Sequence, residues 1–345
     1  MIGGWLALLA AATFAFGNVT ARRGVIQGTV LQGLAITVPI GVPLFLAVAL
    51  ISGAGSALFQ FTIWQVLSLS AAGICHFTLA RYCAYRSVQA LGSNLAAPVQ
   101  RLSLPISLAL ALWLLGEYLT PLRALGIVLV IFGPIIMLAG QVASGRAAKR
   151  KAASSPAPTT TATTFQPRFL EGYFFAVLSA AGYGISPLFV RAALQDADIT
   201  TAIAGGVFSY AAATLLLAPV LLKRSNRRTI FAMPSGPAKW FLVSGMFTAV
   251  SQMIRYMALA LAPVTVVSSI MVSSLVFRFL FSRIINRDHE IFSIWVIVGI
   301  AITILGSLAL TLELGFVLSV LPQSDWLQSI AQWRLPASRN SLDHL

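Results

Sequence analysis

Charged residues are scarce in this sequence, and acidic residues are the scarcest of them. Only 9% of its 345 residues are Asp, Glu, Lys or Arg, and Asp and Glu together number 9. Soluble domains carry about 25% charged residues, so this composition excludes an ordinary soluble domain. Cysteine is limited to Cys75 and Cys83, which share one apolar stretch without metal-ligand spacing. They are interpreted as small buried hydrophobic residues, which argues against a disulfide scaffold.

Several motifs that carry chemistry are also missing. The sequence has no P-loop, no nucleophile elbow and no clustered His, Cys and Asp residues with metal-ligand spacing. We therefore predict that the protein is not an enzyme, is not driven by ATP and uses no cofactor.

Long apolar runs are abundant instead, and 58% of the residues are hydrophobic. A bilayer core of about 30 Å needs roughly 20 apolar residues in helical conformation, and the runs lack the alternation of a β-barrel. We predict an all-α integral membrane protein with ten transmembrane helices. The predicted spans are 4–20, 30–51, 63–84, 92–115, 121–141, 170–190, 200–222, 239–260, 264–285 and 291–312. We expect the first span to be retained rather than cleaved as a secretory signal, because no positive charge precedes it.

The stretch 142–168 differs from the rest of the chain. It contains GRAAKRKAASSPAPTTTATT, which is basic and then rich in Pro, Thr and Ala, so we predict a disordered linker. The linker separates a first five-helix unit, 1–141, from a second unit, 169–313. In the tail, 314–345, the stretch SDWLQSIAQW predicts an interfacial helix, with a disordered tail as the alternative.

The two units resemble each other in sequence. Arg81-Tyr82-x-Ala84 recurs as Arg255-Tyr256-x-Ala258, and Glu117 with two following glycines recurs as Glu290 with two glycines at the same spacing. An odd number of spans in each unit gives the two repeats opposite orientations in the membrane. Such inverted repeats place a substrate site between them near the midplane.

These motifs resemble a known family. Gly116-Glu117-Tyr118-Leu119-Thr120 followed by LGIVLVIFG resembles the end of an EamA-type repeat of the drug/metabolite transporter superfamily. HEIFSIWVIVGIAITILG is a weaker second copy, with His289 where the family usually has Gly. The resemblance covers roughly 3–141 and 170–312, although the usual tryptophan–glycine signature of the first span is absent. It implies a carrier of small metabolites that works by alternating access, without indicating which metabolite.

The recurring acids and glycines have structural interpretations. Glu117 and Glu290 lie in tight turns, where we expect a hydrated carboxylate or a cap on the next helix. The glycines recur every seven residues, which predicts one helix face for close packing. The glycine positions are Gly126, Gly133, Gly299 and Gly306.

The net charge of +14 is distributed unevenly. Most basic residues, including Arg22, Arg23 and the runs 146–151 and 223–228, lie in connections that follow odd-numbered spans. The positive-inside rule explains this bias by membrane topology and not by binding to nucleic acid. It places these connections in the cytoplasm and both termini outside a cell (inner or plasma) membrane, whereas EamA-type carriers are usually drawn with both termini inside.

Four arginines remain within predicted spans: Arg81, Arg101, Arg255 and Arg278. An arginine at a helix centre costs about 3 kcal/mol on insertion scales, and Arg101 lies roughly 14 Å into its span. No acid is predicted at that depth to pair with them. Snorkelling is the structural alternative for Arg81 and Arg255, and carbonyl or aromatic contacts are the alternative for Arg101. The functional hypothesis is a cationic cavity that binds carboxylate or phosphate.

Other polar residues could line the same cavity. Asn94 follows helical spacing with Arg101, and Ser274 does so with Arg278. Asn18, Tyr82 and Tyr256 are further candidates for substrate binding. His76 is the candidate for proton coupling, although on an α-helix it lies about 140° from Arg81.

We therefore predict a secondary transporter or facilitator of a small anionic or zwitterionic metabolite. Its expected partners are this solute and membrane lipids, and the sequence leaves a homodimer open. One alternative is an exporter of neutral amino acids or amphiphilic drugs. Alternatives from other classes are an integral-membrane enzyme acting on lipid phosphate and a non-transporting sensor or scaffold.

Overall fold

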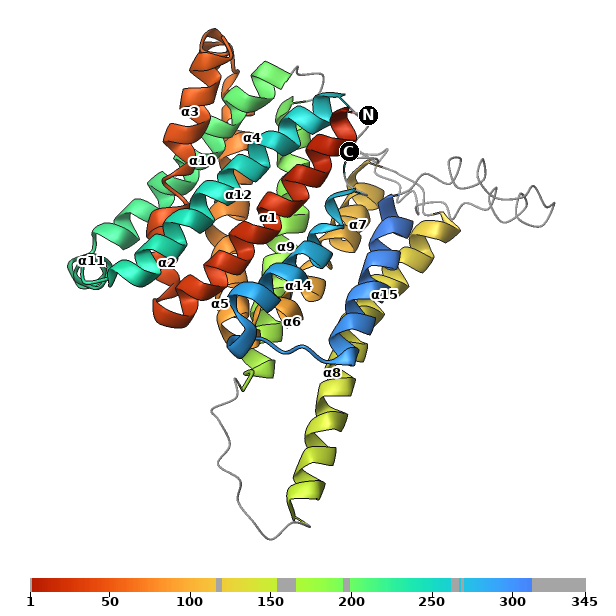
Figure 1. The fold of residues 1–345 in the computed structure, drawn as a ribbon. Helices are drawn as coiled ribbons and strands as arrows, with labels where there is room; N and C mark the ends of the chain where they lie inside the picture. The colour runs from red at the N-terminus through yellow and green to blue at the C-terminus, as the bar shows by residue number, and fades with distance from the viewer. Residues whose placement is uncertain are drawn as a thin grey trace, which may run out of the picture.

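A computed structural model describes residues 2–115, 120–153, 166–194, 199–261, 267 and 270–311. Within these ranges the regular elements are helices, and no strand is present (Figure 1). Short helices among them are η1 (Ser56–Phe59), α11 (Arg224–Phe231) and η3 (Arg287–His289). The others are α1 (Ile2–Gln27), α2 (Val30–Thr37), α3 (Gly41–Ile51), α4 (Ile63–Gly73), η2 (Ile74–Ala80), α5 (Arg81–Leu91), α6 (Ser93–Gln100), α7 (Ser103–Leu115), α8 (Pro121–Ala153), α9 (Phe169–Leu194), α10 (Ile199–Leu222), α12 (Ser235–Leu261), α14 (Ser274–Ile285) and α15 (Ile294–Thr311).

The helices have the length and surface of membrane-crossing segments. Six helical segments in the described ranges are long and apolar enough to cross a bilayer: Gly3–Gln27, Val30–Ile51, Ile63–Leu91, Pro121–Ser144, Phe169–Leu194 and Thr200–Leu222. Their outer faces expose large apolar side chains, among them Trp5, Leu50 and Leu215. Water-soluble monomers rarely expose extensive apolar surface. The protein is therefore an all-helical, multi-pass integral membrane protein.

The predicted span 30–51 is not one continuous helix. Pro39 separates α2 from α3, because proline has no N–H to donate and its ring opposes the preceding turn. The N–H of Gly41 bonds to the carbonyl of Val38 rather than to that of Thr37. The Thr37 carbonyl then accepts a 2.8 Å hydrogen bond from Nη1 of Arg81.

The span that follows is also irregular, because η2 is a π-helical segment between α4 and α5. A π-helix has more residues in each turn than an α-helix, so it changes the face on which later side chains lie. Segments of this kind are frequent at functional sites. The expected angle of about 140° between His76 and Arg81 assumed a regular α-helix, and that assumption was wrong.

Two further differences concern the ends of predicted segments. α1 continues beyond residue 20, through Arg22 and Arg23, to Gln27. α8 continues to Ala153, so the first part of the predicted disordered linker is helical. Ala, Arg and Lys all have high helix propensity, which explains this extension. Figure 1 shows α8 projecting beyond the other helices at the end where it leads into the linker.

Helix packing brings the two halves of the chain together. α1 packs along α12, α9 packs against α4, η2 and α5, and α8 packs along α15 (Figure 1). The predicted glycine face lies in the last of these contacts. A Cβ on Gly126 would lie 2.8 Å from the carbonyl oxygen of Gly306, and one on Gly299 would lie 2.8 Å from that of Gly133. Only glycine allows the two backbones to approach this closely.

Candidate functional site

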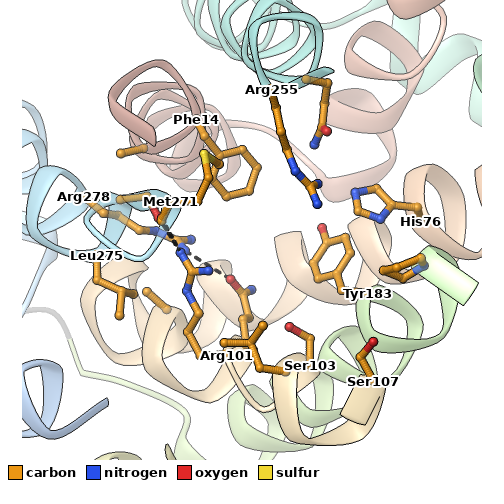
Figure 2. Close-up of a pocket in the computed structure, with 17 residues that line it drawn as sticks. Phe14, His76, Arg101, Ser103, Ser107, Tyr183, Arg255, Met271, Leu275 and Arg278 are labelled. Carbon is orange, nitrogen blue, oxygen red and sulfur yellow. Dashed lines mark hydrogen bonds between the residues drawn. The ribbon is translucent and has the colours of Figure 1, made fainter. Parts of the chain in front are cut away.

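A cavity of about 200 Å³ lies among α1, η2, α6, α7, α9, α12 and α14 (Figure 2). Its lining combines three arginines with neutral polar groups and apolar side chains. The lining residues are Phe14, Ala15, His76, Ala97, Gln100, Arg101, Ser103, Leu104, Ser107, Tyr183, Pro187, Gln252, Arg255, Met271, Ser274, Leu275 and Arg278. The cavity is smaller than the roughly 300–1,000 Å³ of pockets for drug-sized ligands, so it suits a small solute.

Arg101 occupies a break between two short helices. α6 ends at Gln100 and α7 begins at Ser103, and Pro105 cannot donate the hydrogen bond that would continue the helix across the break. Nη2 of Arg101 donates to the carbonyl of Met271, at 3.2 Å, and to Oγ of Ser274. Arg101 and Ser274, both candidate binding residues from the sequence, are therefore in direct contact across the two halves of the chain, although the sequence had grouped Ser274 with Arg278.

Arg278 reaches the cavity from α14 and is only 6% exposed. Its Nε donates to Oγ of Ser93 at 2.6 Å, and its Nη1 donates to Oε1 of Gln100 at 3.1 Å. The third nitrogen, Nη2, is buried and has no hydrogen-bond acceptor among the described residues. An unpaired donor on a buried cation is costly, which makes this atom a candidate contact for a bound anion.

Arg255 faces the cavity from α12, opposite Arg101 and Arg278 (Figure 2). Its guanidinium points toward the side of the cavity formed by His76 and Tyr183. Nδ1 of His76 lies 2.9 Å from Oγ of Ser186, and the His76 ring lies 4.7 Å from the Tyr183 ring. This second polar group thus contains a cation, an imidazole and a phenol.

Arg81 lies beside this site and does not line the main cavity, the one of about 200 Å³. It is 4% exposed, donates to the Thr37 carbonyl and lies 5.0 Å from the centroid of the Phe77 ring. Snorkelling to the lipid headgroups is therefore wrong for Arg81, whose contacts are internal. A second cavity of about 20 Å³ is lined by Arg81, Asn18 and His76, so the π-helical segment places His76 and Arg81 around the same space.

The other predicted binding residues lie elsewhere. Tyr82 is 41% exposed on the outer surface, where its ring faces Phe175 at 6.3 Å. Asn94 is buried outside the cavity, and its Nδ2 donates to the Ile291 carbonyl at 3.3 Å. The side chain of Tyr256 and the whole of Glu117 fall outside the described residues.

Sequence reasoning did not select Phe14, Gln100, Tyr183 and Gln252, although all four line the cavity. Gln100 directly precedes Arg101, and Gln252 lies one helical turn before Arg255. Polar side chains beside a membrane-embedded arginine were therefore an available signal. Phe14 had no such signal, because nothing distinguishes it from the many other apolar residues of its span.

A buried ion pair lies away from the cavity, where the halves meet again. Arg22 and Glu290 approach to 3.5 Å, with side chains that are 1% and 0% exposed. Glu290 accepts hydrogen bonds from the backbone N–H groups of Ser93, at 2.5 Å, and Asn94, at 3.0 Å. It therefore caps α6, which begins just after Gly92 with its positive φ of 86°. The expected hydrated carboxylate, or cap on the helix that follows it, was wrong for Glu290.

Arg22 makes further hydrogen bonds beside this ion pair. It donates to the carbonyls of Val88 at 2.6 Å, Gln89 at 3.0 Å and His289 at 2.8 Å. The sequence placed Arg22 among the loop charges, but it is an internal residue that joins α1, α5 and the connection before α15. His289, which precedes Glu290 in the chain, has a lowered pKa. Partial burial and the positive charges of Arg23 and Arg22 disfavour its protonated form, and the negative charge of Asp288 partly opposes this effect.

Apolar helices of membrane-crossing length around a small cavity that contains three arginines define a multi-pass membrane protein with an internal solute-sized site. Residues 1–139 match the EamA-like transporter family. This match confirms, for the first half of the chain, the resemblance seen in the sequence motifs. The match and the apolar helices together indicate a membrane transporter.

Comparison with solved structures agrees at the level of fold. One crystal structure aligns over 89% of this chain and 94% of its own, with a TM-score of 0.53 and 16% sequence identity. No curated protein sequence matches this chain.

Proposed function

We propose that the protein is a secondary transporter or facilitator of a small anionic or zwitterionic metabolite. The observation that carries this proposal is the cavity lined by Arg101, Arg255 and Arg278 and, among the described residues, by no carboxylate. Guanidinium groups bind carboxylate and phosphate through paired, charge-assisted hydrogen bonds. Charged residues inside a membrane protein commonly mark the pathway of a substrate or ion.

We further propose ten spans, arranged as two inverted five-helix repeats. The packing supports this arrangement, because exchanging the two halves converts the contact of α1 with α12 into that of α9 with α4, η2 and α5. The same exchange leaves the contact of α8 with α15 unchanged. In that contact Gly126 faces Gly306 and Gly133 faces Gly299, which is the antiparallel pairing expected when equivalent helices are inverted.

Alternating access requires a gate on each side of the cavity. The Arg22–Glu290 contact is the proposed gate on the side that holds the linker. It joins α1 and the start of α6 from the first half to the connection before α15 from the second half. Separating the halves here would break a buried ion pair and remove a helix cap, and these contacts support a closed gate on this side in the described conformation.

The residues that line the cavity also bear on how transport is driven. Proton-driven carriers commonly use a membrane-embedded carboxylate whose ionisation is linked to substrate binding. No Asp or Glu lines the described cavity, so we propose facilitated diffusion or exchange, with His76 as the candidate for any proton coupling. We place the protein in the cell membrane with the linker in the cytoplasm, because basic connections favour that side.

The test uses purified protein in liposomes loaded with an unlabelled organic anion. Counterflow of the same labelled anion, recovered chemically unchanged, would support a carrier. Arg101→Gln should weaken this counterflow, and Arg227→Gln, the same substitution on the exposed helix α11, should not. Counterflow restricted to neutral amino acids or amphiphilic drugs would overturn the anion proposal. Conversion of a lipid phosphate without counterflow would overturn the transporter proposal.

A further inference from the structure

The cavity contains two separate cationic groups rather than one. On one side, Arg101 and Arg278 lie with Ser274 and Gln100, while on the other side Arg255 lies with His76 and Tyr183 (Figure 2). Apolar side chains, including those of Phe14 and Met271, line the space between these groups. An anionic group can therefore be bound at each side, with a short apolar stretch between the two.

Both cationic groups can take an anionic partner. Nη2 of the buried Arg278 has no acceptor among the described residues, and the half-buried Arg255 faces the cavity without a carboxylate in the described lining. Arg255 and Arg101 are also close enough to repel each other electrostatically. A single bound carboxylate could satisfy the donors on one side only, and the cation on the opposite side would remain without an anionic partner.

Nearby acidic residues do not remove this excess of positive charge. Glu290 interacts electrostatically with Arg278, but it is already in contact with Arg22 and with two backbone N–H groups. Glu290 thus interacts with both buried cations, Arg22 and Arg278. Arg101 and Arg255 face the cavity, whose described lining contains no carboxylate.

We infer that the transported solute is a short organic dicarboxylate, with one carboxylate at Arg101 and Arg278 and the other at Arg255. This inference rests on the proposed transport function and specifies its substrate class. The small volume of the cavity favours a chain of a few carbon atoms between the two acids. Tyr183 and His76 are positioned to contact the carboxylate at Arg255 (Figure 2).

The experiment compares solutes that differ by one charge. Proteoliposomes loaded with succinate exchange it for labelled succinate, and unlabelled competitors are added outside. Succinamate has nearly the same shape as succinate but carries one carboxylate fewer, and glycerol 3-phosphate concentrates its two charges at one end. We expect succinate to compete at least about tenfold better than either, because each lost charge-assisted contact costs roughly ten- to a hundredfold in affinity.

Variants then connect this preference to the structure. Arg255→Gln should reduce the preference for succinate over succinamate to less than about threefold, because the second carboxylate loses its cation. Arg255→Lys should restore part of the preference, since it keeps the charge without the bidentate geometry. Arg227→Gln on the exposed helix α11 is the matched control. Thermal unfolding in detergent establishes that each variant is folded.

The outcomes separate this inference from the proposed function. Equal competition by succinate and succinamate would overturn the dicarboxylate inference and leave anion transport intact. Preference for glycerol 3-phosphate would also overturn it, in favour of a phosphate ester. Counterflow of neutral solutes without any organic anion would overturn both proposals. A succinate preference that Arg255→Gln leaves unchanged would show that Arg255 does not bind the second acid.

Discussion

Replacing Arg278 with glutamine tests whether this arginine serves solute binding or only folding. The substitution removes the charge and the unpaired Nη2 that the cavity offers to a ligand. It also removes two internal hydrogen bonds, to Ser93 and Gln100. If Arg278 binds the solute, the same amount of folded variant should have a lower affinity for the solute. If Arg278 is only structural, the variant should be less stable but should bind the solute with unchanged affinity.

The expected size follows from the contact that is lost. A hydrogen bond to a charged partner contributes about 1.5–3 kcal/mol, and we expect roughly 2–3 kcal/mol in a poorly hydrated cavity. This corresponds to about a thirty- to hundredfold increase in the dissociation constant. Arg101→Gln should weaken binding by a similar factor, and Arg101→Lys should recover only part of it, because lysine lacks the planar fork.

The assay is concentration-dependent counterflow in proteoliposomes, combined with thermal unfolding of the same preparations. Arg81→Gln is the matched comparison, because Arg81 is a buried arginine with contacts to the Thr37 carbonyl and the Phe77 ring, and it does not line the main cavity. We expect Arg81→Gln to lower stability more than affinity. Folded Arg278→Gln and Arg101→Gln variants with unchanged affinity would refute the reasoning and favour a neutral solute.

Three further predictions address the gate, the topology and the coupling. Glu290→Ala should destabilise the protein by about 3–5 kcal/mol, because it removes the carboxylate that compensates the buried charge of Arg22; an additive effect with Arg22→Met would contradict this pairing. Ser154→Cys should resist a membrane-impermeant maleimide in intact cells, and ready labelling would reverse the orientation. His76→Ala should abolish any accumulation driven by a pH gradient, so accumulation that survives this change would exclude coupling through His76.

The sequence predicted much of the architecture because membrane constraints are strong and local. Long apolar runs identify helices without knowledge of their neighbours. An arginine in such a run must find polar surroundings away from lipid, which is why Arg101, Arg255 and Arg278 could be expected in one cavity. The seven-residue spacing of the glycines likewise predicted a close contact between helices. Two helix backbones can approach this closely only where the facing residues have no Cβ atom.

The interruptions of helices within the predicted spans were harder to predict from the sequence, because they depend on contacts with residues far away in the chain. Pro39 marks a place where helical hydrogen bonds are lost, but the sequence does not reveal that Arg81 bonds to the freed Thr37 carbonyl. The π-helical segment contains no proline and has an ordinary apolar sequence, ICHFTLA. Its effect on His76 follows from packing against other helices, so face angles calculated for an ideal helix were misleading.

Glu290 shows how a local interpretation of the sequence misses a contact between the two halves of the chain. A glutamate in a tight turn suggests capping of the nearest helix, yet its carboxylate caps α6 in the other half. Ser93, whose N–H bonds to Glu290, also accepts a hydrogen bond from Nε of Arg278 through its hydroxyl. Through Ser93, the arginine that lines the cavity is therefore connected to the buried Arg22–Glu290 ion pair.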